Sequence, residues 1–195
     1  YWYDAATIGQ YAIALGFVTL VPQLTGKVVG AVAFPRISQA KRESQQEFER
    51  TVGIARRMYD VISMTSAGAL FTCGPLVVHL LYDDRYVSAG WMLSVLSCGL
   101  ILARGELYNS IYFTLGQTKL LPIFSGIALL TLFILVPWGH HLAGLKGAIW
   151  VMGLRHLLVL PVHYYFLSKH HLNRFQDDAV AVLYWVLGAL IGLGF

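Results

Sequence analysis

Apolar segments long enough to cross a membrane fill most of this 195-residue sequence. A spanning helix needs about 20 mostly apolar residues. Six stretches meet or approach that length: 9–34, 60–82, 86–115, 119–139, 145–168 and 179–195. Charged residues are 12% of the chain, whereas a typical soluble domain has about 25%. We therefore expect an all-α polytopic membrane protein, a bundle of about six transmembrane helices in a single lobe.

The segments between these stretches are mostly short, which predicts antiparallel neighbouring helices. One connection, 36–57, is longer and polar, with the sequence RISQAKRESQQEFERTVGIARR. Apolar residues recur there at helical spacing: Phe48, Val52, Ala55 and Tyr59. We expect an amphipathic cytoplasmic helix that lies at the membrane surface and runs into the second span. Pro35 is expected to end or bend the first span.

The basic residues divide unequally between the two sides of the predicted bundle. One side carries nine of them: Arg36, Lys41, Arg42, Arg50, Arg56, Arg57, Lys119, Lys169 and Arg174. The other side carries Arg85 and Lys146. The positive-inside rule places the nine-residue side in the cytoplasm. Arg57 and Asp60 are expected to mark the inner border of the second span.

Charged residues inside the predicted spans are the candidate functional residues, because a charge at bilayer depth is costly. Arg104 and Glu106 lie two residues apart in ILARGELYN, so on one helix they point about 200° apart and do not pair with each other. Lys27 and Arg155 are the other cations within spans. A cavity with these cations would attract an anion from the cytoplasm. The alternatives are that Lys27 extends to the headgroups and that the others form structural pairs.

Residues that interrupt helices are frequent in the predicted spans, among them Pro22, the pair Gly74-Pro75, and Pro161. They suit a transporter whose helices bend, and they are also common in ordinary membrane helices.

The sequence offers little support for catalysis, for a metal site or for a cofactor. It lacks the short motifs of hydrolases, nucleotide-binding proteins and zinc proteases. Cys73 and Cys98 lie in apolar segments and are expected to be small buried residues. His156 and His163 are seven residues apart and serve either a proton step or packing. We expect no enzyme activity, no cofactor and no nucleic-acid partner.

Three stretches give the chain a resemblance to a known family: ATIGQYAIALGFVTLVPQLTGKVVGAVAFPRIS, LLYDDRYVSAGWMLSVLS and LGQTKLLP. In order and spacing they resemble the second half of a bacterial oligosaccharide flippase. That family is the Wzx-like, polysaccharide-transporter branch of the multidrug/oligosaccharidyl-lipid/polysaccharide exporter superfamily. The chain begins without Met and stops inside an apolar run, so we expect a C-terminal-half fragment.

The resemblance implies a complete protein of about 12 to 14 spanning helices in the bacterial inner membrane, with a missing N-terminal lobe as partner. It implies flipping of undecaprenyl-diphosphate-linked oligosaccharide from the inner to the outer leaflet, among membrane lipids. The cavity cations would then be Arg104, Lys27 and Arg155, the last on a more peripheral helix, and Glu106 would orient a basic partner or carry a coupling proton. The alternatives are a multidrug or peptidoglycan-precursor exporter of the same superfamily, or a membrane O-antigen polymerase or ligase.

Overall fold

The computed structural model describes residues 3–102, 105–158, 160–169 and 175–194. Within these ranges the chain is helical and has no strand. The elements in chain order are α1 (Ala5–Glu43), α2 (Gln45–Leu81), η1 (Asp84–Tyr86), α3 (Val87–Ser97), η2 (Cys98–Leu102), α4 (Gly105–Thr114), α5 (Leu120–Leu154), η3 (Arg155–Leu158), α6 (Leu160–Lys169) and α7 (Phe175–Leu193), where η marks a 3-10 helix. The prediction of an all-α chain is confirmed for the described residues.

The two longest helices, α1 and α2, form a hairpin whose turn is a single residue, Ser44. Its backbone is extended, and its side-chain oxygen accepts a hydrogen bond from the backbone N–H of Glu47 at 3.1 Å. A serine followed three residues later by a glutamate is the sequence pattern of a capped helix start. The segment 36–57 is therefore two helix ends that meet at Ser44, and differs from the single surface helix that was predicted. Pro35 lies inside α1 and does not end it.

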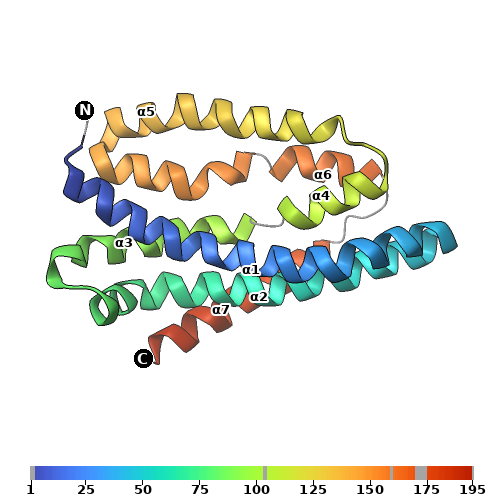
Figure 1. The fold of residues 1–195 in the computed structure, drawn as a ribbon, viewed down its shortest axis with the longest axis horizontal. Coiled ribbons are helices and arrows are strands. Elements are labelled where there is room, and N and C mark those ends of the chain that lie inside the picture. Colours follow the sequence, from blue (N-terminus) through green and yellow to red (C-terminus); the bar gives the residue numbers. More distant parts are fainter. Residues whose placement is uncertain (1–2, 103–104, 159, 170–174, 195) are drawn as a thin grey trace.

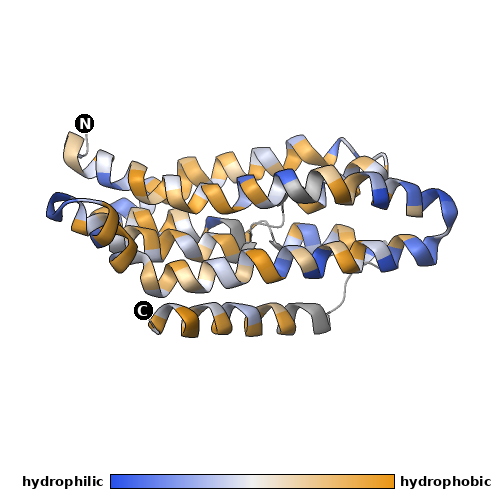
Figure 2. Ribbon diagram, turned by 60° about the horizontal axis from the view of Figure 1, so that its bottom comes forward, coloured by the Kyte–Doolittle hydropathy of each residue, from blue (hydrophilic) through white to orange (hydrophobic). Residues whose placement is uncertain are grey.

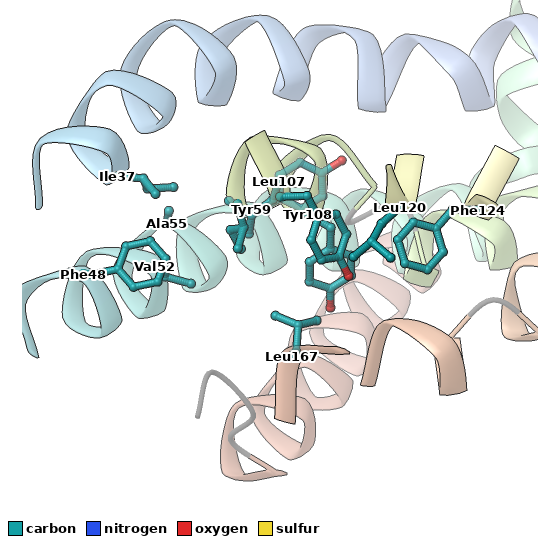
Figure 3. Packing of buried hydrophobic residues seen from close by; sticks show 12 residues of the cluster. Ile37, Phe48, Val52, Ala55, Tyr59, Leu107, Tyr108, Leu120, Phe124 and Leu167 are labelled. Atoms are coloured by element: carbon teal, nitrogen blue, oxygen red, sulfur yellow. The ribbon is translucent and has the colours of Figure 1, made fainter. Parts of the chain in front are cut away.

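The apolar stripe predicted on this segment is buried inside the protein. Phe48 and Tyr59 are fully buried, and Val52 and Ala55 nearly so. They belong to a cluster with Ile37 of α1 and with residues of α4, α5 and α6, part of which Figure 3 shows. The stripe thus packs against other helices, because the hairpin folds α1 over it.

The long helix α5 is a second hairpin, made of two arms that meet at Ala143 and Gly144. Gly144 has φ 59° and ψ −141°, which is backbone that glycine adopts far more readily than other residues. The two arms lie close together next to this turn. A Cβ atom added to Gly139 of the first arm would lie 2.8 Å from the carbonyl oxygen of Gly147 in the second arm. The arms run side by side in Figure 1. This reversal falls between the predicted spans 119–139 and 145–168.

Helix α2 is the centre of the packing, because it contacts α1, α3 and α7 as well as η2. A second buried cluster, around Met92, Leu93 and Val78, joins α2 and α3 with α1 and α5 at the other end of the bundle. Figure 2 shows apolar residues along the length of the helices and hydrophilic residues gathered toward the two ends. That distribution is the one expected of a bundle surrounded by lipid.

Three of the described helical segments are long and apolar enough to cross a membrane by length and composition: Ala5–Lys27 within α1, Gln45–Leu81 (α2), and Leu120–Leu154 (α5), which includes both arms of the second hairpin. A shorter apolar helix covers Val180–Leu193. Large apolar side chains are exposed on these helices, for example Leu130, Phe133 and Trp138 on α5, each about three-fifths exposed or more. A surface of this kind is stable next to lipid and unstable in water.

Candidate functional site

Two helical rods of the bundle are interrupted, and their interruptions lie next to each other. In the first rod α3 ends at Ser97, η2 follows to Leu102, and α4 begins at Gly105. In the second, the second arm of α5 leads into η3, and α6 begins at Leu160. Segments η2 and η3 are in contact. In Figure 1 the two interruptions lie at a similar level along the long axis.

Glycines let the two rods approach closely at this level. A Cβ atom added to Gly99 of η2 would lie 3.1 Å from the carbonyl oxygen of Gly153. One added to Gly153 would lie 2.7 Å from the carbonyl oxygen of Val95. Two backbones are therefore packed against each other immediately before both interruptions.

Interrupted helices can bind ligands, because the backbone groups at helix ends have no hydrogen-bond partner inside their own helix. In a membrane such groups are tolerated only where they are buried in protein or line a hydrated cavity. The first residues of α4 and α6 carry the positive end of the helix dipole, which favours an anion. Discontinuous helices of this kind form substrate and ion sites in many transporters.

Helix α2 carries a buried polar face beside this region. Arg56 is 4% exposed, and Asp60 and Ser63 are each 1% exposed. These residues are four and three positions apart and so lie on one face of the helix. Their neighbour Tyr59 belongs to the same buried cluster as Leu107 and Tyr108 of α4, and α2 contacts both η2 and α4.

Arg56 and Asp60 both interact with other groups of the protein. Removing one partner from a buried charged network is strongly destabilising, by about 3–5 kcal/mol, because an uncompensated charge remains. Ionisable residues inside a membrane bundle are functional candidates for the same reason. Arg56 and Asp60 therefore join the candidate site.

An aromatic cluster formed with α4 and α5 holds His163 of α6. The Nδ1 atom of His163 is 2.9 Å from the hydroxyl of Tyr112, within hydrogen-bond distance. Its ring stacks on Phe124, with centroids 4.1 Å apart, and lies 4.7 Å from the ring of Tyr108. His163 is thus a packed, hydrogen-bonded residue. His156 lies in η3, a different segment, so the two histidines do not share one continuous helix.

The cations and the acid predicted from the sequence are placed unequally. Lys27 is exposed at the end of the apolar part of α1. Arg155 is the first residue of η3 and half-buried, and its Nε atom is buried with no hydrogen-bond partner among the described residues. Arg104 lies outside the described residues, and Glu106 lies in α4, where the structure describes its backbone alone. Arg155 is therefore at one interruption, and Glu106 is the second residue of the helix after the other.

The sequence predicts Asp60 at the inner border of the second span and Arg56 among the nine basic residues of the cytoplasmic side, and the structure buries both side chains. The spacing of Arg56 and Asp60 relative to the apolar stripe could have indicated this burial. Arg56 directly follows Ala55, and Asp60 directly follows Tyr59, so both lie at the edge of the apolar stripe that the spacing predicted. A charge adjacent to each of two stripe positions, four residues apart, indicates a polar face that turns inward with the stripe.

The comparisons with known proteins agree with this picture at a coarse level. Residues 1–90 match the model of the family described as "Polysaccharide biosynthesis protein". No curated protein and no solved structure matched the chain. The matched residues comprise α1, α2 and the first turn of α3, and so include Arg56 and Asp60. Together with the apolar helices, the match supports a membrane protein of a polysaccharide-biosynthesis or flippase type, with a role in polysaccharide synthesis or transport.

Proposed function

We propose that this chain is the second lobe of a flippase that moves undecaprenyl-diphosphate-linked oligosaccharide from the inner to the outer leaflet of the bacterial inner membrane. The flippase serves the synthesis of a surface polysaccharide, such as a lipopolysaccharide or an exopolysaccharide. It works as a transporter, without enzymatic chemistry and without a cofactor. Its partners are its lipid-linked substrate, the surrounding lipids and an N-terminal lobe of the same chain.

In this proposal six helical rods cross the membrane. They are α1, α2, the rod of α3 and α4, the first arm of α5, the rod made by the second arm of α5 with α6, and α7. The turn at Ser44 then lies in the cytoplasm, together with the basic residues around it. What supports this arrangement is the alternation of rods and tight turns, which makes neighbours antiparallel, and the unequal distribution of basic residues.

The observation that carries the proposal is the contact between the two helix interruptions, η2 with η3, beside the buried polar face of α2. A lipid-linked diphosphate must pass its charged headgroup through an apolar layer, and that passage needs polar groups in mid-membrane. Helix starts and arginine guanidinium groups are both suited to phosphate oxygens. Arg155 and Arg104 would contact the headgroup, Lys27 would attract it at the cytoplasmic entrance, and Glu106 would orient a cation or carry a coupling proton.

The test uses the full-length protein in cells that depend on it for polysaccharide export. Arg155→Gln removes the charge at one interruption and keeps most of the side-chain volume. Outer-leaflet exposure of the lipid-linked glycan, measured with a membrane-impermeant reagent, should fall at least about tenfold, the effect of losing one phosphate contact in a low-dielectric site. Protein abundance in the membrane, measured in parallel, should be unchanged.

Arg42→Gln is the matched control, because Arg42 is an exposed residue near the hairpin turn. It should leave the exposure of the glycan at the wild-type level. Full export by the Arg155 variant would remove the proposed role of the interruptions. If the glycan reached the outer leaflet normally in cells lacking the protein and only its polymerisation failed, the polymerase alternative would replace the flippase proposal.

A further inference from the structure

A groove on the outside of the α1–α2 hairpin has the shape and charge distribution of a lipid site. Its volume is about 430 Å³, within the range of small-molecule pockets. It is lined by Val32, Ala33, Arg36, Glu47, Arg50, Thr51, Ile54, Ala55, Met58 and Ile62. The groove shares Ala55 with the buried stripe of α2. Arg56, Asp60 and Arg155 are not among its lining residues, so it is separate from the candidate site described above.

The polar and apolar residues of the groove lie at opposite ends. Helix α1 runs toward the turn at Ser44 and α2 runs away from it, so Arg36, Glu47 and Arg50 lie nearer the turn than Val32, Ile54 and Ile62 do. The sequence between Lys27 and Arg36 contains no charged residue. Arg36 therefore marks the level at which α1 changes from apolar to polar.

The apolar end of the groove is open to the surroundings. Met58 is 61% exposed, Val32 63% and Ile54 52%. They belong to helices that contain candidate membrane spans or extend directly from them. Exposed apolar side chains at this level are covered by hydrocarbon chains in a membrane, which makes a lipid tail the natural occupant of this end.

The polar end carries an excess of positive charge. Arg36 and Arg50 each contribute one positive charge, and Glu47 contributes one negative charge. The Glu47 carboxylate lies 3.6 Å from Nη1 of Arg50, and both side chains are well exposed. An exposed ion pair of this kind is worth little, so a phosphate can replace the carboxylate as the partner of Arg50. Arginine binds phosphate oxygens in a fixed two-pronged geometry.

We infer that this groove binds one anionic glycerophospholipid of the bilayer, its phosphate held by Arg36 and Arg50 and one acyl chain lying along Val32, Ile54 and Met58. The inference does not depend on the flippase proposal, because the groove requires only a membrane. Basic pockets beside spanning helices on the cytoplasmic side commonly hold anionic lipids. Bound lipid would fix the angle between α1 and α2 at the end of the hairpin.

The test measures lipid binding to the full-length protein by native mass spectrometry from a neutral detergent. Phosphatidylglycerol and phosphatidylcholine with identical acyl chains are the two probes. Phosphatidylglycerol should bind more tightly. Arg36→Gln and Arg50→Gln should each weaken its binding about fivefold, with little effect on phosphatidylcholine. Arg42→Gln, an exposed cation near the same turn but outside the groove, should have no effect.

Glu47→Gln should change phosphatidylglycerol binding in the opposite direction to the arginine variants. It removes the carboxylate that competes for Arg50, and glutamine keeps the capping pattern at the start of α2, so phosphatidylglycerol should bind more tightly than to the wild type. A damaged fold would not produce such a gain. Equal binding of the two lipids, an Arg42→Gln loss as large as that of Arg36→Gln, or displacement of the lipid by inorganic phosphate alone would each overturn the inference.

Discussion

The close packing of α7 against α2 predicts that a single methyl group added at their interface lowers the stability of the protein. Glycines bring the two helices together: Gly188 and Gly192 on α7, one turn apart, and Gly68 on α2. A Cβ atom added to Gly188 would lie 2.9 Å from the Cα atom of Thr65 and closer still to its carbonyl oxygen. Small residues one turn apart are a common means of close helix approach in membranes.

The size of the stability loss caused by Gly188→Ala follows from this geometry. To reach an ordinary contact, the distance between the new Cβ atom and Cα of Thr65 must increase by 0.5 Å, from 2.9 to 3.4 Å, and the closer contact with the carbonyl oxygen requires a larger separation still. The hydrogen bond from the Thr72 hydroxyl to the carbonyl oxygen of Ala189 is already 3.2 Å long, and an equal separation would break it. Overpacking of this kind costs about 1–3 kcal/mol, and the lost hydrogen bond adds about 0.6 kcal/mol.

Gly188→Ala should therefore be less stable than the matched variant Gly126→Ala by about 2–4 kcal/mol. Gly126 lies in α5, and a Cβ atom there would have no neighbour within 4 Å. Both substitutions gain the same helix propensity, about 1 kcal/mol, so the comparison isolates the interface. The free energy of unfolding is measured by titrating the protein in mixed micelles with a denaturing detergent. Equal stability of the two variants would refute the close approach of α7 to α2.

Two further substitutions test features of the same bundle. Tyr112→Phe keeps the stacking on Phe124 but removes the hydroxyl that lies 2.9 Å from Nδ1 of His163; it should lower the free energy of unfolding by about 0.6–1.7 kcal/mol, and no change in the same titration would mean that water replaces the hydroxyl. Gly144→Ala meets no atom within 4 Å but must adopt φ 59°; it should cost about 1–3 kcal/mol through the backbone alone, and an unchanged stability would mean that the turn has another geometry.

Much of the fold was predictable, because long apolar segments joined by short connections can pack only as antiparallel helices. The reversals near Asp83, Gln117 and Ala143 lie where the sequence between apolar stretches is short. The spacing of Phe48 and Tyr59 predicted an apolar helical stripe, but it predicted neither the burial of the stripe inside the protein nor the helix that covers it. A helical stripe looks the same whether it packs on a membrane or on another helix, and the capping pattern at Ser44 was the sign of a hairpin.

Proline positions were a weaker guide to the interruptions of helices. Pro161 lies in the first turn of α6, where a proline is tolerated, and it coincides with a true interruption. Pro22, Pro35 and Pro75 lie inside continuous helices, because neighbouring helices and side chains compensate for the missing N–H in a membrane bundle.

The interruption before α4 has no proline at all in its sequence, CGLILARG. It occurs where Gly99 lies against Gly153, more than fifty positions further along the chain. A tertiary contact of this range is not visible in local sequence, and this is why the candidate site was predicted as separate charges and not as a pair of adjoining helix breaks.

The hydrogen bond from Thr72 to Ala189 joins residues 117 positions apart, and this separation has a consequence for synthesis. At about 5–20 residues per second, α2 emerges from the ribosome some 6 to 23 seconds before α7 exists. During that interval Thr65, Gly68 and Thr72 lack α7 as their partner. A helix surface of small residues favours association with another helix that has a similar surface. The newly made chain must therefore be kept from its own copies until α7 arrives. Variants in which the synthesis of α7 is delayed should be degraded, or should associate with one another.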